Sequence, residues 1–187
     1  MPGAADEASL IARIAAGDAL ALRELLARHQ VRVYRFILRL VQRAAVAEEL
    51  TNDVFLEVWR HAGSYQGSAS AITWMLSIAH HRAVSSLRKR REEDWDEKAA
   101  AALADTADDP EVCAQKLDKG AILRQCLDEL SPEHRGIIDL VYYHEMSIAE
   151  AGAVLQIAEN TVKTRLFYAR KRLSQLLKQA GIDRGWP

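Results

Sequence analysis

Apolar residues recur three and four positions apart along almost the whole chain, which is the spacing of one face of an α-helix. The sequence has no run of alternating β-branched residues of the kind that marks strands. Helix-forming Ala, Leu, Arg and Glu dominate the 187 residues, and only four prolines and nine glycines interrupt them. The pattern predicts an all-α protein whose short helices pack as bundles.

The breaks between these helices divide the chain into two helical units and a linker. Four helices are predicted in the first unit, over residues 8–16, 19–42, 45–62 and 71–91, and four in the second, over residues 116–130, 132–143, 148–155 and 160–179. The stretch between them is acidic and contains Pro110, as is typical of a solvated linker. We predict a first domain over 1–92, an acidic linker over 93–115 and a second domain over 116–187.

Charge is segregated along the chain, although the formal net charge is only -1. Basic side chains concentrate at residues 82–91 and 163–178, on either side of the acidic linker. Two basic surfaces favour contact with nucleic acid, whereas a merely solvated basic helix is the alternative that charge alone allows.

Residues 147–173, SIAEAGAVLQIAENTVKTRLFYARKRL, fit a helix-turn-helix: a short helix, a tight turn at 156–158, and a longer helix that opens at Glu159 or Asn160. In such motifs the N-terminal residues of the second helix enter the major groove. At about 100° per residue, one narrow face of this helix is apolar: Val162, Leu166, Ala169, Leu173 and Leu176. The other faces carry Thr161, Lys163, Thr164, Arg165, Tyr168, Arg170, Lys171 and Arg172. This arrangement suits a helix that clamps phosphates while shorter side chains approach base edges.

Two helices of the first unit carry distinctive outward faces. In helix 45–62 the predicted buried stripe is Ala47, Leu50, Val54 and Val58, and Leu56 lies outside it among Glu49, Asn52 and Asp53. In helix 71–91 the predicted inward residues are Leu76, Ala79, Ala83 and Leu87, and the other side carries Trp74, His81, Arg82, Ser85, Arg88 and Lys89. The first face indicates a protein contact and the second an opened DNA strand. A solitary exposed leucine and a core tryptophan are the alternatives.

The C-terminal segments TVKTR and ARKRL resemble region 4 of the extracytoplasmic-function sigma factors, and LDELSPEHRGIIDLVYYHEMSIAEAG resembles the stretch that leads into it. The resemblance implies minus-35 contacts by Thr161, Lys163, Thr164, Arg165 and Tyr168, and DNA-backbone contacts by Arg170, Lys171 and Arg172. Gln156 stands where the family usually has a turn glycine, and Gly152 where it usually has alanine. We expect both departures to lower local stability.

AEELTNDVFLEVWR, residues 47–60, resembles the family's region 2.2, which docks on the clamp helices of core RNA polymerase. This implies core contacts by Glu49, Asn52, Asp53 and Leu56. TWMLSIAHHRAVSSLRKRR resembles regions 2.3 and 2.4, which melt and read the minus-10 element, and implies DNA contacts by Trp74, His81, Arg82, Ser85, Arg88 and Lys89, with the loop at 63–71 as a pocket wall. The family usually has Asn at position 81 and commonly Asp at 85, so we expect a minus-10 preference particular to this chain.

The resemblance therefore implies an alternative sigma factor that directs promoter-specific initiation by core RNA polymerase. It also implies an anti-sigma factor, membrane-anchored or zinc-binding in many cases, that holds the chain inactive until a stress signal. A helix-turn-helix regulator that binds promoter DNA without polymerase is the first alternative, and a module that binds no DNA is the second. An enzyme is disfavoured because the sequence has no Gly-rich phosphate loop and no nucleophile elbow, and we expect neither a cofactor nor a small-molecule substrate.

No metal site is expected, because adjacent helical residues such as His80 and His81 point about 100° apart and do not easily share one ligand sphere. Cys113 and Cys126 lack ligand spacing and are expected to be ordinary small residues. The N-terminus lacks the basic and apolar regions of a signal peptide, and no window has the length of a membrane span. These features predict a cytoplasmic protein.

Overall fold

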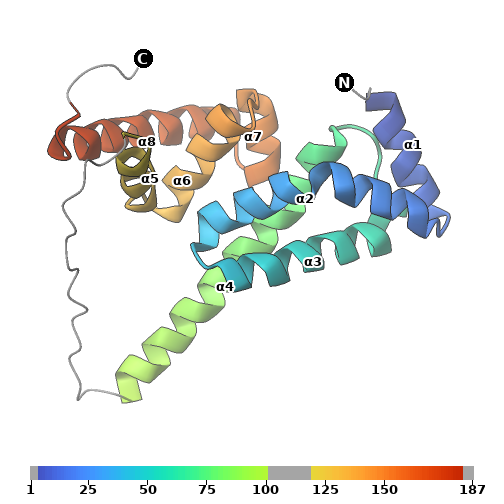
Figure 1. Cartoon of the computed structure of the whole chain (residues 1–187), viewed down its shortest axis with the longest axis horizontal. Helices are drawn as coiled ribbons and strands as arrows, with labels where there is room; N and C mark the ends of the chain where they lie inside the picture. The colour runs from blue at the N-terminus through green and yellow to red at the C-terminus, as the bar shows by residue number, and fades with distance from the viewer. Residues whose placement is uncertain (1–3, 101–118, 183–187) are drawn as a thin grey trace.

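The computed structural model describes residues 4–100 and 119–182, and this part of the chain consists of helices and the turns between them (Figure 1). The N-terminal unit contains α1 (Ala4–Ala15), α2 (Ala19–Val41), α3 (Ala44–His61), the 3-10 turn η1 (Ala62–Ser64) and α4 (Ala71–Ala100). The C-terminal unit contains α5 (Lys119–Asp128), α6 (Pro132–Ile138), the π-helical turn η2 (Asp139–Tyr143), α7 (Ile148–Leu155) and α8 (Glu159–Gln179). The all-α prediction is confirmed.

The N-terminal unit buries one apolar stripe from each helix. Asp18 caps α2 by accepting hydrogen bonds from the backbone N–H groups of Leu20 and Ala21, at 2.9 and 3.2 Å. The predicted stripe of α3 is buried: Ala47, Leu50, Val54 and Val58. In α4, Leu76, Ala79 and Ala83 are buried as predicted, and Leu87 is half-buried. The helical spacing of apolar residues thus identifies the core of this bundle.

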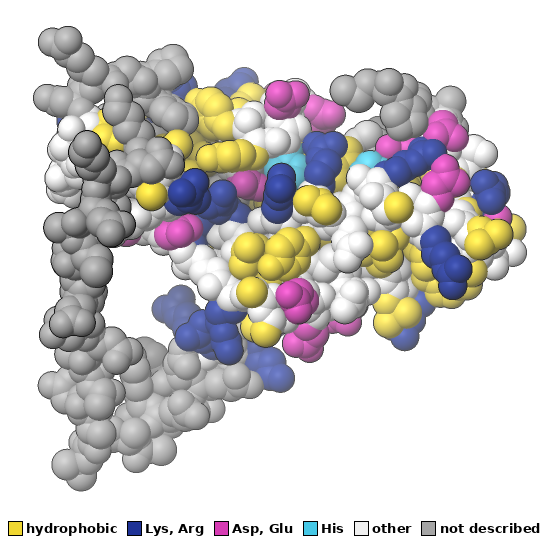
Figure 2. Space-filling model, viewed as in Figure 1, with side chains coloured by type: hydrophobic (Ala, Val, Ile, Leu, Met, Phe, Trp, Pro, Cys, Tyr) yellow, Lys and Arg dark blue, Asp and Glu magenta, His cyan; other side chains and the backbone are white. Residues whose placement is uncertain are grey.

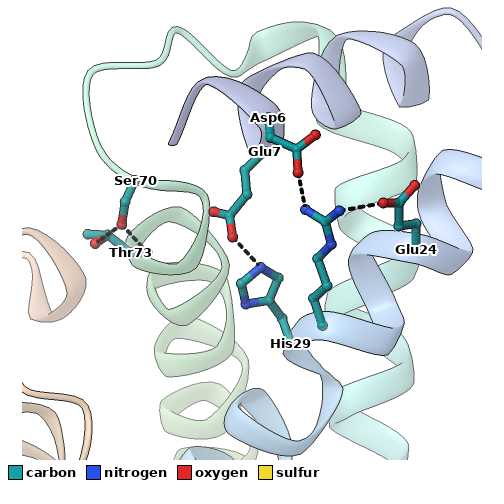
Figure 3. Close-up of polar contacts among 7 residues, drawn as sticks. Asp6, Glu7, Glu24, His29, Ser70 and Thr73 are labelled. Atoms are coloured by element: carbon teal, nitrogen blue, oxygen red, sulfur yellow. Dashed lines mark hydrogen bonds and ion pairs between the residues drawn. The ribbon is translucent and has the colours of Figure 1, made fainter. Parts of the chain in front are cut away.

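Helix α1 is tied to α2 by a set of polar contacts (Figure 3). A Glu7 carboxylate oxygen lies 2.9 Å from His29 Nε2, and Asp6 accepts a hydrogen bond of 2.6 Å from Arg28. Arg28 also pairs with Glu24 one turn earlier in α2. Burial lowers the pKa of His29, while the carboxylate of Glu7 acts in the opposite direction.

Helix α4 continues past Arg91, where the sequence analysis ends it, to Ala100. Residues 92–100, EEDWDEKAA, contain no Pro or Gly, and Glu, Lys and Ala are strong helix formers. An acidic composition therefore does not exclude helix, and the backbone of this part of the predicted linker is helical. The rest of the predicted linker, including Pro110 and Cys113, lies outside the described residues, and the proposed domain boundaries remain a prediction.

The C-terminal unit is organised by two capped helices and the long α8. Ser131 caps α6, accepting a hydrogen bond from the backbone N–H of His134 at 3.3 Å. In α8 the predicted apolar face is largely buried, with Val162, Ala169, Leu173 and Leu176 inside and Leu166 half-buried. Cys126 packs in this core, where burial raises the pKa of its thiol.

The two units pack against each other rather than lying apart (Figure 1). Helix α7 lies on α4, and α6 lies on α2. Helix α2 also contacts the residues on either side of α6: the Phe36 ring meets His144, which follows η2, edge-on with centroids 5.8 Å apart, and Gln42 Nε2 donates to the backbone oxygen of Asp128 in α5 at 3.0 Å. We call this contact between α2 and the C-terminal unit the seam. The sequence analysis did not predict it.

A glycine permits the close approach of helices at the seam. A Cβ atom added at Gly136 would lie only 2.9 Å from Leu40 Cδ2, and Leu40 is itself buried. Because Cδ2 ends a flexible side chain, a methyl group at 136 is accommodated by a small shift. A larger side chain must push α6 away from α2.

We therefore expect Gly136→Leu to separate the two units. Overpacking typically costs about 1–3 kcal/mol, which is enough to shift a marginal interdomain contact. Small-angle X-ray scattering should show a larger radius of gyration while circular dichroism shows unchanged helix content. Gly63→Leu is the control, since a Cβ at Gly63 meets nothing within 4 Å. An unchanged radius of gyration in Gly136→Leu would contradict the expectation.

Candidate functional site

Helices α7 and α8 form a helix-turn-helix, as predicted. A capping box starts α7: Ser147 Oγ accepts from the Glu150 backbone N–H at 3.2 Å, and a Glu150 carboxylate oxygen accepts from the Ser147 backbone N–H at 2.9 Å. The Ser147 hydroxyl also donates to the Glu150 carboxylate at 2.7 Å, and this hydrogen bond, followed by the one from the Ser147 backbone N–H, lowers the pKa of Glu150. These hydrogen bonds fix the direction of α7, which sets the angle at which α8 is presented.

Both departures from the family pattern lie at or next to the turn between α7 and α8. Gln156 takes the left-handed conformation with a φ of 55°, which costs a side-chain-bearing residue more than glycine. A Cβ at Gly152 would lie 3.0 Å from the backbone oxygen of Ile157, so glycine relieves a contact that alanine would make. The turn therefore gives a steric reason for glycine at position 152.

The outward face of α8 is exposed over nearly all of the predicted DNA-contacting residues. Thr161, Lys163, Thr164, Tyr168, Arg170, Lys171 and Arg172 are exposed. Arg165 is half-buried and lies 3.8 Å from a Glu133 carboxylate oxygen. The Phe167 and Tyr168 rings meet edge-on at 5.4 Å and add an exposed aromatic pair that the sequence analysis assigned only in part. A basic helix with this geometry can clamp phosphates and bring Thr and Tyr side chains to base edges.

The outward face of α4 carries both exposed and half-buried side chains. His81, Arg88 and Lys89 are exposed, whereas Arg82 donates to Glu57 on α3, with its Nε 2.7 Å from the carboxylate. Trp74 is half-buried against Tyr65, with ring centroids 5.1 Å apart. Trp74 is thus neither fully buried nor fully exposed, and its role in binding DNA stays a prediction.

The loop before α4 is held in place by Tyr65. Its hydroxyl donates a hydrogen bond of 2.5 Å to the backbone oxygen of Ala69. At the start of α4, Ser70 accepts a hydrogen bond of 3.2 Å from the backbone N–H of Thr73 (Figure 3). Burial and the negative charge of Glu7 raise the pKa of Tyr65. The acidic start of α1 thus lies within electrostatic reach of this loop, a proximity that no sequence motif signals.

The structure brings the two outward faces of the N-terminal unit together. Glu49, Asn52 and Leu56 on α3 are exposed, and Asp53 is half-buried. Glu49 and Asp53 line a groove of about 510 Å³ with residues of α4. The α4 side of that groove includes Arg82, Ser85 and Lys89. The proposed protein-binding and strand-binding residues are therefore neighbours, with Leu56, 46% exposed, on the α3 side.

The packing of the two units places DNA-facing residues of one beside the other. The pKa of His80 on α4 is lowered, chiefly by burial, and further by the positive charge of Arg165 and then by that of His81. Arg165 of α8 therefore lies within electrostatic reach of α4 in this closed arrangement.

His80 gives the closed arrangement a pH dependence. A histidine whose pKa is lowered in the folded state resists protonation there. Its contribution to the free energy of unfolding is therefore complete above about pH 6.5 and is lost as the pH falls below that value. We expect the wild type to lose thermal stability between pH 7.5 and 5.5 more steeply than His80→Gln. Parallel melting curves for both proteins across this range test it, and equal slopes would exclude a role for His80.

Residues 4–100 and 119–182 contain no group of three His, Cys, Asp or Glu side chains arranged to hold a metal ion. Within these ranges, none of the helices combines the length and apolar character needed to cross a bilayer.

Comparison with known proteins matches both units. Residues 25–93 match the family described as Sigma-70 region 2, and residues 120–173 match Sigma-70, region 4. The ECF RNA polymerase sigma factor SigK of Mycobacterium ulcerans is 33% identical over 94% of this chain and 96% of its own length. SigK of Mycolicibacterium vanbaalenii is 32% identical over 93% of this chain and 89% of its own.

Two solved structures share the fold. The sigma factor RpoE of Bartonella quintana, in complex with the anti-sigma factor NepR, superposes with a TM-score of 0.68 at 25% identity, covering 87% of this chain and 98% of RpoE. CnrH, in complex with the cytosolic domain of CnrY, gives a TM-score of 0.67 at 22% identity, covering 92% and 97%. With full-length relatives above 30% identity and both regions matched in order, the chain belongs to the extracytoplasmic-function group of the sigma-70 family of RNA polymerase sigma factors.

Proposed function

We propose that α3 docks on core RNA polymerase, α4 binds the opened minus-10 strand and α8 reads the minus-35 duplex. The observation that carries the proposal is the exposed basic face of α8 behind a capped helix-turn-helix, in a chain of this family. On α3, Leu56 with Glu49 and Asn52 offers an apolar contact framed by polar groups. On α4, Trp74, His81, Arg88 and Lys89 offer stacking surface and positive charge for a single strand.

The role is one of recognition, and the bond chemistry belongs to the core polymerase. None of the proposed contacts on α3, α4 or α8 requires a nucleophile or a general base, only phosphate clamping, base contacts and apolar docking. Such a subunit works where the polymerase and its promoters are, and we propose that it acts in the cytoplasm.

Promoter binding requires the two units to separate. Elements at minus-35 and minus-10 lie about 25 base pairs apart, which is about 85 Å at about 3.4 Å per pair. In the closed arrangement Arg165 of α8 is close enough to His80 of α4 to lower its pKa. The closed form therefore cannot span both elements, and we propose that it is the inactive form.

An anti-sigma factor is the proposed agent that keeps the chain inactive. RpoE, a sigma factor of known structure that is 25% identical to this chain, was crystallised with the anti-sigma factor NepR. An inhibitor that binds the accessible faces of α3 and α8 would both block polymerase and prevent opening.

Reconstituted transcription tests the proposed function. Purified protein is added to core polymerase on a library of promoters, and run-off products are sequenced. We expect initiation at a restricted set of promoters that share minus-35 and minus-10 elements. No initiation on any promoter, together with binding of duplex DNA by the protein alone, would instead favour a regulator that acts without polymerase.

A further inference from the structure

A cavity of about 500 Å³ opens at the seam, lined by residues of both units. Its lining includes four arginines: Arg32, Arg35 and Arg39 of α2, and Arg124 of α5. Two carboxylates, Asp128 and Asp139, also line it, so the cavity has a net positive charge. On the face shown in Figure 2, several Lys and Arg side chains gather near the middle, where α2 meets the C-terminal unit.

The four arginines differ in whether their guanidinium groups already form hydrogen bonds or ion pairs within the protein. Arg39 lies 3.7 Å from both Asp128 and Asp139 and stacks over the Tyr143 ring at 5.5 Å. Arg32 donates a long hydrogen bond, 3.4 Å, to the backbone oxygen of His144. Within the described part of the chain, the guanidinium groups of Arg35 and Arg124 make no hydrogen bond or ion pair. One uncommitted cation from each unit therefore borders the same cavity.

Two buried polar atoms among the lining residues also lack hydrogen-bond partners. Asp139 is 4% exposed, and its Oδ2 lies 3.1 Å from His144 Nε2 but outside hydrogen-bonding geometry. Nδ1 of His144 has no partner either. Buried polar atoms are nearly always satisfied in folded proteins. Of these two atoms only His144 Nδ1 can carry a proton and donate to an anion in the cavity. Asp139 Oδ2 is an acceptor that an anion does not satisfy, and it lies at ion-pair distance from His144 instead.

We propose that this cavity binds a diphosphate group, either as free pyrophosphate or on a nucleotide, and that the bound anion holds the two units closed. Guanidinium groups pair with phosphate oxygens through two parallel hydrogen bonds, and Arg35 and Arg124 would each take one phosphate. A volume of about 500 Å³ accommodates a small molecule. The exposed Tyr143 ring offers a surface on which a nucleobase can stack.

The regulatory consequence follows from where the arginines lie. A ligand that contacts α2 and α5 together binds the closed form and not the open one, so it shifts the population toward closure. The inference rests on the seam alone. The binding test contains no polymerase, so it can fail or succeed independently of the proposed transcription function.

The test is titration calorimetry of the full-length protein with inorganic pyrophosphate and, separately, with ADP. Arg35→Glu with Arg124→Glu should weaken binding at least about tenfold, since both proposed phosphate partners are reversed in charge. Arg23→Glu with Arg60→Glu is the matched control, because both residues are exposed, lie outside the cavity and give the same change in charge. Pyrophosphate should also reduce the radius of gyration of the wild type but not that of the cavity variant.

These measurements distinguish free pyrophosphate from a nucleotide as the ligand, and either of them from non-specific charge attraction or an acidic protein partner. Equal affinity for pyrophosphate and ADP supports a site for diphosphate alone, and tighter binding of ADP supports a nucleotide stacked on Tyr143. Equal weakening in the cavity and control variants overturns the proposal in favour of non-specific charge attraction. Binding of polyglutamate but not of pyrophosphate overturns it in favour of an acidic protein partner.

Discussion

Replacing Lys163 and Arg165 by glutamate is expected to abolish minus-35 binding while leaving association with core polymerase intact. Both residues lie in the first two turns of α8, the part of a recognition helix that approaches the groove. The double change converts two phosphate-attracting groups into two that phosphates repel, and the lost contacts should also lower the salt dependence of binding. The docking residues of α3 are on the other unit and are unaffected.

The measurement is a mobility-shift assay of the reconstituted holoenzyme on a promoter taken from the transcription library. We expect the double variant to assemble with core polymerase as wild type does, but to lose promoter binding by at least about a hundredfold. Arg23→Glu with Lys178→Glu, which changes the charge equally at two exposed positions outside the proposed contacts, should bind as wild type does. Simultaneous loss of core assembly and DNA binding in the Lys163 and Arg165 variant would show that the two roles are not separable.

Replacing Leu56 by arginine is expected to prevent assembly with core polymerase without unfolding the chain. Leu56 is 46% exposed, so its replacement leaves the core of the bundle intact. Burial of an apolar anchor at an interface contributes about 2 kcal/mol or more, and a buried unpaired cation adds a further cost. Affinity for core should therefore fall at least about thirtyfold.

Leu20→Arg provides the matched control for this second prediction. Leu20 is 68% exposed on α2, so the control makes the same substitution on a face with no proposed docking role. Size-exclusion chromatography with core polymerase should show a complex for wild type and Leu20→Arg, and free protein for Leu56→Arg. Normal assembly of Leu56→Arg would remove Leu56 from the proposed docking surface.

The periodicity of the sequence predicts each helix and its buried face because those depend on local spacing. Val54 and Val162 are examples, since each lies on the stripe predicted for its helix and both are fully buried. The helix-turn-helix is predictable for the same reason, as Ser147 and Glu150 stand at capping-box spacing.

The seam was not predictable because it depends on residues that are far apart in the sequence. The contact between Phe36 and His144 and the fit of Leu40 against Gly136 carry no local signature. The engagement of Arg82 by Glu57 is similar: a wheel shows which face Arg82 occupies but not that α3 supplies a carboxylate 2.7 Å away. Sequence patterns thus locate the candidate contacts, and tertiary packing decides which of them are free.

The continuation of α4 to Ala100 has a mechanical consequence for a protein whose two units must part. A helical residue advances about 1.5 Å along the axis, whereas an extended one spans about 3.4 Å. Unwinding residues 92–100 would thus lengthen the tether between the units by about 17 Å. A local helix-coil transition in this stretch would therefore let the two units move farther apart. Replacing its alanines by glycine would favour the unwound form and change the promoter spacing that the protein tolerates.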